Sequence, residues 1–349
     1  MLADFGASVV MVEPPGGSPI RALAPSGRDG TSILAAYVLA NKQSVVLDIE
    51  DGGQRELVRG LIGRADVLVS SARPSTLARL GLGYAGLRQP SLIMAHVTPF
   101  GMTGDLAEAP GNDLAVAALS GWASINGLAD REPLKPSGWQ SSFCAGTAAY
   151  AAILAALHHR DLYPGEGQEV DVAEVEVMAA AFAPAMLGAM YSGEGRGRRK
   201  EIDMTGGPVP VADGYFALTI SRAHFWRDAM NLLGLTDLAE DPRWEASYYR
   251  AAHKDEYVHR VEAAMREWNK MDLFDELAGR RVVAGPVLTM EDLAENDHLG
   301  GRGFWTKPTE GQTSIDYPGP SFRMSETPWE LRNSAPSPGQ HSNQMESGT

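Results

Sequence analysis

The stretch Gly165-Glu166-Gly167-Gln168-Glu169-Val170-Asp171-Val172 lies between two helical patterns and connects them. Pro164 and the two glycines end the long alanine-rich helix that precedes this stretch. Gln168–Val172 then alternates as a short strand, and the next apolar helix begins at Glu174. Taken alone, this order of helix, turn and strand is a structural connector, so the fold class depends on its neighbours.

Four other short runs, rich in Val and Ile, predict parallel strands that are buried on both faces. They are Ser8–Glu13, Ser44–Ile49, Asp66–Ser70 and Leu92–Thr98. Helical patterns such as Gly52–Gly63 separate them, so strands and helices alternate along the chain. This alternation predicts an α/β domain with a doubly wound, Rossmann-like parallel sheet, whose ligand binds at the carboxyl ends of the strands.

A change of composition at Gly193–Lys200 predicts a linker between two domains. Beyond the linker, Val209–Ile220 has the pattern of a hairpin that turns at Asp213-Gly214, and helical patterns follow it. This part predicts a smaller α+β domain. We expect a large domain, a linker, a small domain and a C-terminal return to the large domain, at residues 1–192, 193–207, 208–295 and 296–349.

The composition excludes several classes of protein. A formal net charge of −14 over 349 residues argues against a surface that binds nucleic acid or anionic membranes. The single cysteine, Cys144, cannot form an internal disulfide, and no cysteine–histidine cluster has the spacing of a zinc site. No secretory signal or bilayer-spanning apolar run stands out. We therefore expect a cytoplasmic protein without a metal, a nucleic-acid partner or a membrane association.

Several short motifs occur in a fixed order along almost the whole chain, around the connector described above. Together they resemble the family III CoA-transferases, the CaiB/BaiF family. The resemblance implies an enzyme that transfers CoA between an acyl-CoA and a carboxylic acid. It also implies an interlocked dimer in which each active site uses both subunits. The motifs are Leu39–Asp48, Gly165–Val172, Ala284–Val287, Asp297–Leu299, Pro318–Pro320 and Ser325–Trp329.

The beginning of the chain departs from the resembling enzymes. Met1–Ala7 has the pattern of a helix end closed by a glycine cap, and a buried strand follows at once. A domain that starts inside a helix predicts a truncated or misassigned start. The resemblance then implies that the sheet lacks its first strand and that the CoA site lacks one of its walls.

The resemblance also implies where CoA binds. The segment from Leu39 to Lys42 matches the lining of the CoA nucleotide site, with Lys42 in the place of a phosphate-contacting lysine. Arg73, Arg79 and Leu80 match a second CoA stretch. A lysine before a buried strand can act as a point charge for a phosphate, although a solvated loop lysine fits the same pattern. Ser70–Ala72 replaces a Glu-Asn-Phe motif, which puts adenine packing in doubt.

The catalytic residue of the family is missing. Family members carry an aspartate four residues before the glycine that matches Gly146, and its carboxylate attacks the acyl-CoA thioester to give a mixed anhydride. In this chain that position is Ser142, and no acidic residue occurs from Lys135 to His159. A serine ester is much more stable than an anhydride, so the acyl group would stall on it. The usual covalent mechanism should therefore fail.

Other polar residues allow more than one interpretation. Asp113 lies in a family motif and is either catalytic or a helix N-cap. Glu174 is either a base or a first-turn acid that the helix dipole favours. Cys144 is either a nucleophile or, more simply, an inert core cysteine. Asn112 cannot act as a base, which argues against racemase chemistry by a His/Asp pair, and His96 in an apolar strand predicts a core histidine.

Three functions stay open from the sequence. The first is a CoA-transferase that uses CoA or acyl-CoA as its substrate and needs no metal. The second is a non-catalytic subunit that pairs with an aspartate-bearing paralogue, and the third is an acyl-CoA racemase or isomerase. The chain is expected to form a homodimer or a heterodimer through the helix at Phe143–His159, because its small side chains allow close helix approach.

Overall fold

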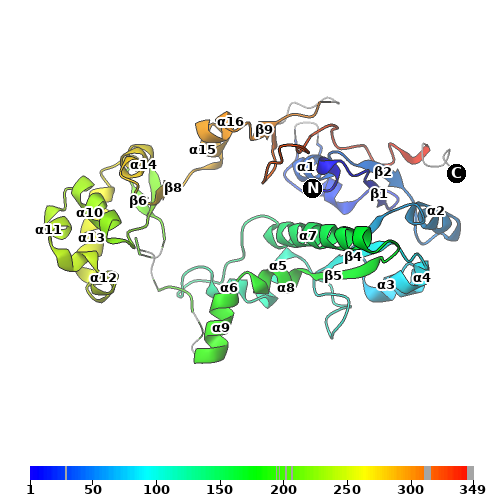
Figure 1. Ribbon diagram of the computed structural model, residues 1–349, viewed down its shortest axis with the longest axis horizontal. Coiled ribbons are helices and arrows are strands. Elements are labelled where there is room, and N and C mark those ends of the chain that lie inside the picture. Colours follow the sequence, from blue (N-terminus) through cyan, green and yellow to red (C-terminus); the bar gives the residue numbers. More distant parts are fainter. Residues whose placement is uncertain are drawn as a thin grey trace. The chain divides into compact units, whose positions relative to one another are not determined.

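The computed structural model describes residues 1–27, 30–193, 195, 197–200, 203–205, 207–309 and 316–343 (Figure 1). The chain forms two compact units. Unit 1 contains Met1–Ile125, Leu134–Arg196 and His298–Thr349, and unit 2 contains Asn126–Pro133 and Gly197–Asp297. The division predicted from the sequence differs in detail, because it places residues 126–133 in the large domain. That four-part division stays a prediction.

Unit 1 contains two parallel sheets. The strand β1 (Val10–Glu13) pairs with β2 (Gln43–Val46), and β3 (Val67–Ser70), β4 (Ile93–Thr98) and β5 (Gln168–Ala173) form a three-stranded sheet. All five predicted strands are therefore present, with ends that differ by a few residues. The expected single sheet is divided, since among the described residues β1 pairs only with β2, and β3 only with β4.

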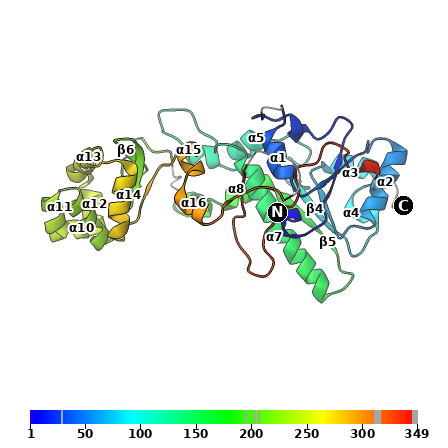
Figure 2. The same ribbon diagram turned by 90° about the horizontal axis from the view of Figure 1, so that it is seen from above.

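Helices cover both faces of the three-stranded sheet. On one face, α2 (Gly52–Ile62) and α3 (Pro74–Leu80) pack against β4 through an apolar cluster. On the other face, α7 (Gln140–Leu162) lies along β4 and β5 (Figure 2), where small residues such as Ala145 and Ala149 contact Val172. The result is the layered α/β arrangement that the alternating pattern predicts.

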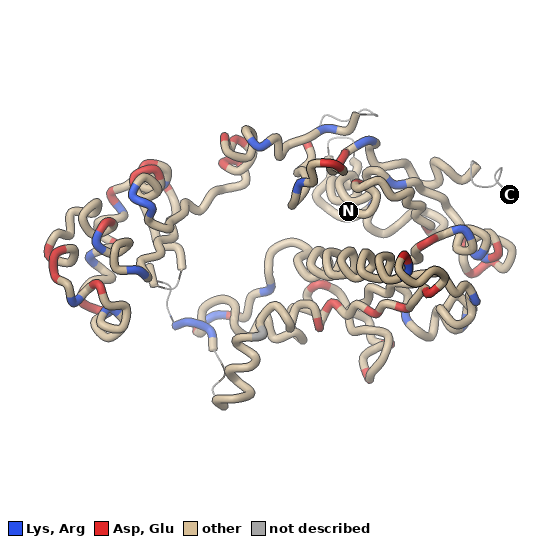
Figure 3. The backbone as a smooth tube through the Cα atoms, viewed as in Figure 1, with Lys and Arg blue, Asp and Glu red and all other residues tan. Residues whose placement is uncertain are grey.

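The helix α7 carries no charged residue from Gln140 to His159, as Figure 3 shows along its length. It is 23 residues long and apolar enough to cross a membrane by length and composition, so the prediction that no stretch meets this criterion is wrong. Alanine-rich helices in protein cores meet the same criterion, and here one face of α7 packs on the sheet. The pair α8 (Glu174–Ala180) and α9 (Ala183–Ser192) meets it only when counted as one bent span.

The remaining elements of unit 1 are short. The predicted helix after β5 is divided into α8 and α9, with Pro184 in the first turn of α9, where a proline is tolerated. Gly6 closes the first helical turn with a φ of 105°, which favours glycine. The other elements are η1 (Ala3–Phe5), η2 (Pro19–Ala22), α1 (Ile33–Leu39), α4 (Tyr84–Leu87), α5 (Asp113–Leu119), α6 (Trp122–Ile125), β9 (Trp305–Thr306) and β10 (Tyr317–Pro318).

Unit 2 is a small α+β unit built around one cluster of buried apolar residues. The predicted hairpin is confirmed as β6 (Val209–Val211) and β7 (Gly214–Leu218), and β8 (Ala284–Pro286) extends it to an antiparallel sheet. The indole of Trp226 is fully buried and donates a hydrogen bond of 2.8 Å to the carbonyl of Leu238. The helices are α10 (Ala223–Leu232), α11 (Thr236–Glu240), η3 (Pro242–Glu245), α12 (Ser247–Ala252), α13 (Lys254–Met265), α14 (Lys270–Gly279) and α15 (Met290–Ala294), and α16 (Asp297–Gly301) follows at the passage to unit 1.

Candidate functional site

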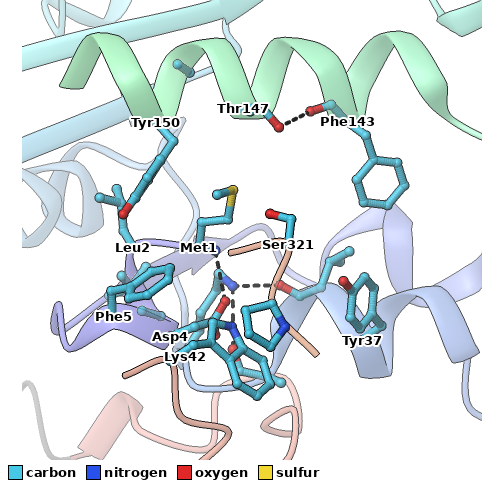
Figure 4. A pocket seen from close by; sticks show the side chains of 18 of the residues that line it. Met1, Leu2, Asp4, Phe5, Tyr37, Lys42, Phe143, Thr147, Tyr150 and Ser321 are labelled. Carbon is cyan, nitrogen blue, oxygen red and sulfur yellow. Dashed lines mark hydrogen bonds and ion pairs between the residues drawn. The ribbon is translucent and has the colours of Figure 1, made fainter. Parts of the chain in front are cut away.

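A cavity of about 730 Å³ lies inside unit 1. Its wall is mostly apolar and comes from the first residues, from α1, from α7 and from the segment around β10. Figure 4 shows Phe143, Thr147 and Tyr150 of α7 on one side of the cavity, with Met1 and Phe5 across from them. A cavity of this size can hold a small-molecule ligand, since such sites measure roughly 300–1,000 Å³.

The cavity adjoins both pieces of the divided sheet. Val9, which precedes β1, lines it together with Val69 of β3 and Val97 of β4. The side chain of Val69 is 52% exposed, which is unusual for an apolar residue in a strand of an α/β sheet. Residues of the three-stranded sheet and the residue before β1 therefore border the same apolar space.

The start of α7 forms one wall of this cavity. Trp139, Ser142, Phe143 and Gly146 all line it. Ser142 and Gly146 are four residues apart, so they lie on the same face of the helix. Ser142 is exposed and lines the cavity, so the position where the family aspartate is expected lies at the cavity wall.

Asp113 is buried, with 5% of its surface exposed, and it binds the start of α7. Its Oδ1 accepts hydrogen bonds from the backbone N–H of Ser141, at 2.9 Å, and from the Ser141 hydroxyl. Its Oδ2 accepts one from Lys135 Nζ at 3.1 Å. Burial raises the pKa of Asp113, but the hydrogen bonds from Ser141 and Lys135 outweigh it and hold that pKa below its usual value.

The N-cap alternative for Asp113 is wrong for its own helix. Asn112 caps α5, because its side-chain oxygen accepts the backbone N–H of Ala115 at 3.0 Å. Asp113 instead satisfies a free N–H at the first turn of α7, 28 residues further along the chain. It serves as a cap for a helix other than its own.

Glu174 lies beside this cluster as the first residue of α8 and is half-buried. The hydroxyls of Ser142 and Ser141 lower the pKa of its carboxyl group. Burial and the negative charge of Asp113 nevertheless raise the pKa of Glu174 above its usual value.

Lys42 is the residue of the predicted CoA site that lines the cavity. Its Nζ donates hydrogen bonds to the carbonyls of Val38 at 2.6 Å and Ala40 at 3.5 Å. Burial lowers the pKa of Lys42, and the nearby Asp4 opposes this effect. The lysine is thus held inside the unit by local backbone acceptors (Figure 4).

The other predicted CoA residues do not line the cavity. Arg79 is exposed and makes two hydrogen bonds of 2.6 Å to the carboxylate of Glu50. Arg73 is exposed and donates to the carbonyl of Glu108 at 3.3 Å. Leu39 and Leu80 are buried, so their side chains belong to the core. The structure therefore brings Lys42 and Ser142 to one cavity and leaves the two arginines on the surface.

Sequence reasoning missed Lys135 and Ser141, and it misplaced Cys144. Ser141 and Lys135 gain their roles only through the contact with Asp113, and no local motif marks that contact. Cys144 is exposed, so the interpretation as a core cysteine is wrong. His96 is buried as predicted, with Nε2 2.8 Å from Glu169 Oε1, but its Nδ1 has no hydrogen-bond partner among the described residues.

Comparisons with known proteins agree with this architecture. A model of the family described as CoA-transferase family III matches residues 1–342. The succinate–glutarate CoA-transferase of Agrobacterium fabrum is 33% identical over 359 aligned residues, which cover 99% of this chain and 89% of that protein. Subunit BbsE of the succinyl-CoA:(R)-benzylsuccinate CoA-transferase of Thauera aromatica is 32% identical, with coverages of 99% and 88%.

A solved structure has the same fold. The crystal structure of a CaiB/BaiF family protein from Brucella suis matches with a TM-score of 0.87 and 28% sequence identity. The match covers 99% of this chain and 93% of that protein.

Proposed function

The chain belongs to CoA-transferase family III, and we propose that it transfers CoA from an acyl-CoA to a carboxylic acid in the cavity beside α7. The observation that carries this proposal is that Ser142 and Lys42 line one cavity. Relatives at 33% and 32% identity are named for succinate or succinyl-CoA, so succinyl-CoA is the donor to test first. A test measures CoA transfer from succinyl-CoA to a panel of dicarboxylic acids.

We assign CoA binding to Lys42 and Arg79, with Leu39, Arg73 and Leu80 shaping the same region. Arg79 must leave Glu50 to reach a phosphate, and the exposure of both side chains makes this exchange inexpensive. Replacing Lys42 and Arg79 together by alanine should weaken CoA binding by about 2–4 kcal/mol, because hydrogen bonds to charged groups contribute about 1.5–3 kcal/mol each and the exposure of Arg79 reduces its share. Calorimetry measures this change.

Glu50→Gln is the matched control for that experiment. It removes the partner of Arg79 without touching the arginine, so CoA affinity should stay the same or increase. Unchanged affinity in the double alanine variant would remove the assignment of both residues.

A second candidate function is that of a subunit which relies on an aspartate-bearing partner. It is favoured by the absence of any carboxylate on the cavity-facing turns of α7, and by the relative that is named as one subunit of an enzyme. This candidate function is supported if CoA transfer appears only after a paralogue is added that has an aspartate at the matching position. Racemase chemistry has no support at position 112, where Asn112 serves as a helix cap.

We also propose a dimer whose interface includes α7. Apolar side chains on this helix that do not line the cavity stay exposed in the single chain, among them Leu154 at 43% and Leu162 at 61%. Exposed apolar side chains on a helix with no charged residue from Gln140 to His159 favour a protein interface. Light scattering at micromolar concentration should give the mass of a dimer, either for this chain alone or for this chain mixed with the candidate partner. A monomer under both conditions contradicts this proposal.

A further inference from the structure

We propose that a second cavity of unit 1 binds a phosphate group, carried either by the nucleotide end of CoA or by a free phosphorylated metabolite. This cavity has a volume of about 640 Å³. It adjoins the cavity beside α7, because Pro320, Trp329 and Leu331 line both. The proposed CoA transfer assigns no residue to this second cavity, and the inference does not depend on that function.

The lining of the second cavity is strongly basic. Its charged residues in the described part of the chain are four cations and one carboxylate, namely Arg302, Lys307, Arg323, Arg332 and Glu330. The chain as a whole has a formal net charge of −14, so the local excess of positive charge is opposite in sign to the average of the protein. A concave surface lined by one sign of charge attracts a ligand of the other sign. The lining therefore favours an anionic ligand.

Hydrogen bonds hold three separate segments together around this cavity. The strands β9 and β10 pair, and the N–H of Gly319 extends the pairing to the carbonyl of Phe304 at 2.7 Å. The N–H and the hydroxyl of Thr309 donate to the carbonyls of Leu331 and Arg332, each at 3.1 Å. The cations therefore lie on a hydrogen-bonded framework and not on independent loops.

Asn41 connects this framework to the cavity beside α7. Its side-chain oxygen accepts the backbone N–H groups of Arg332 at 2.8 Å and Asn333 at 3.0 Å. Its Nδ2 donates to the carbonyl of Glu330 at 2.8 Å. Asn41 directly precedes Lys42, which lines the first cavity. A ligand that occupies both cavities thus meets one rigid wall, and this makes CoA one of the two sources of the phosphate to be tested.

Two of the four cations are already held by groups of the protein. Lys307 pairs with Asp316 at 3.5 Å. Arg332 donates to the carbonyl of Ala3 at 2.5 Å, although a guanidinium group has further N–H donors to offer. These two residues supply positive charge to the cavity without being its main ligands.

Arg302 and Arg323 are the residues that we assign to the phosphate. Both are exposed, and neither makes an ion pair within the described ranges. The Nη2 atom of Arg323 lies 3.9 Å from the point at which a side chain on Gly303 would begin. Its guanidinium group therefore lies beside the residue that follows Arg302, and the two arginines approach each other from segments about 20 residues apart.

A phosphate group matches this arrangement better than a single carboxylate does. It carries up to two negative charges and three strong acceptor oxygens, so it can bind two guanidinium groups at once. The planar fork of N–H donors on arginine fits the oxygens of a phosphate in pairs. The chemistry of the lining thus identifies the class of ligand, and experiment must identify the molecule that carries the phosphate.

The experiment measures the binding of pyrophosphate, CoA and succinate to the full chain by calorimetry. Arg302→Ala combined with Arg323→Ala should weaken the binding of pyrophosphate, of CoA or of both by about tenfold or more, because hydrogen bonds to charged groups are lost. The matched control combines Arg266→Ala with Arg280→Ala and removes two exposed arginines of unit 2, so affinities should stay unchanged. Melting curves verify that each variant is folded.

Competition between the ligands distinguishes the two sources of the phosphate. If CoA supplies it, the double variant binds CoA more weakly, and saturating CoA prevents the binding of pyrophosphate. If a free metabolite supplies it, pyrophosphate binds in the presence of saturating CoA, and the arginines affect the affinity for pyrophosphate alone. Either result supports the site.

Glu330→Gln tests the same site with the opposite sign, and it decides the question if the double variant unfolds. It removes a carboxylate from the lining, so the affinity for the phosphate-bearing ligand should rise by about two- to fivefold. Its backbone contacts with Asn41 and Asp4 do not involve the side chain.

Three results overturn the inference. They are the absence of binding by both pyrophosphate and CoA, binding that changes in neither the arginine variant nor Glu330→Gln, and binding of succinate with the same dependence on these residues. If phosphate binding depends on the arginines but the protein transfers no CoA, the site stands and the proposed function fails.

Discussion

Unit 1 contains two buried clusters around carboxylates, one at β1 and one at the start of α7, and they differ in how fully the carboxylates are satisfied. Glu13 at the end of β1 is 0% exposed. It accepts hydrogen bonds from Arg21 Nη2 at 2.6 Å and Nε at 2.7 Å, from the backbone N–H of Ser18 at 2.7 Å, and from the Ser44 hydroxyl. In the other cluster, the hydroxyls of Ser142 and Ser141 lower the pKa of Glu174, while burial and the negative charge of Asp113 raise it.

The difference explains why the pKa values of the two glutamates shift in opposite directions. The hydrogen bonds from Arg21 exceed the effect of burial and, with those from Ser44 and Ser18, lower the pKa of Glu13 to about 2. No cation lowers the pKa of Glu174, so burial dominates and that pKa rises. Burial alone therefore does not make a carboxylate reactive, because the outcome depends on the donors buried with it.

The largest expected effect comes from breaking the Glu13 cluster. Glu13→Gln leaves Arg21 without its charge partner, and removing one member of a buried ion pair typically costs about 3–5 kcal/mol. Urea unfolding followed by hydrogen exchange in peptides from β1 and β2 measures the loss in unit 1 alone. Glu50→Gln, which breaks the exposed pair with Arg79, is the control and should change stability far less, because solvent screens an exposed ion pair. Equal effects of the two changes would contradict the comparison.

Acid should remove the contribution of Glu13. The folded pKa of about 2 lies below the ordinary value of 4.5, so the stabilisation is fully present above pH 4.5 and is lost as the pH falls toward 2. The difference between these pKa values corresponds to about 3 kcal/mol. The stability gap between the unmodified protein and Glu13→Gln, measured across this range, should close. A gap that is independent of pH would show that the ion pair is not its cause.

A smaller effect is expected at Asp113. Asp113→Asn weakens the cap of α7 and removes the charge partner of Lys135, which together should cost about 1–2 kcal/mol. Hydrogen exchange in the first turn of α7 measures the local change. Asp105→Asn provides a control on an exposed loop. Unchanged protection at Ser141 and Ser142 would remove Asp113 as the anchor of this helix.

The smallest effect on stability is expected at Glu174, and its sign is opposite to that at Glu13. A carboxyl group with a raised folded pKa favours the folded state while it is protonated, and this contribution is lost as the pH rises through that pKa. Relative to the unmodified protein, Glu174→Gln should therefore gain stability as the pH rises from 4 toward 8. Melting temperatures of both proteins across this range provide the test. A gain on going toward acid would show that the pKa of Glu174 is lowered instead.

Local patterns predicted most of the elements correctly. The five parallel strands of unit 1 and the hairpin of unit 2 follow from alternating or continuous apolar runs, because such runs depend on neighbours only a few residues away. The missing carboxylate at Ser142 also came from counting along one helix. The sequence alone therefore determined the fold class and the family resemblance, and the absence of the expected nucleophile at Ser142 stays a prediction.

Only the tertiary structure decided what surrounds that position. Asp113, Ser141 and Glu174 belong to three different helices, and no local pattern predicts that they meet. The division of the parallel sheet, the cavity beside it and the inward direction of Lys42 likewise depend on packing between distant segments. Sequence patterns record short-range preferences, whereas the pKa of a carboxyl group depends on the donors and charges that the fold places around it.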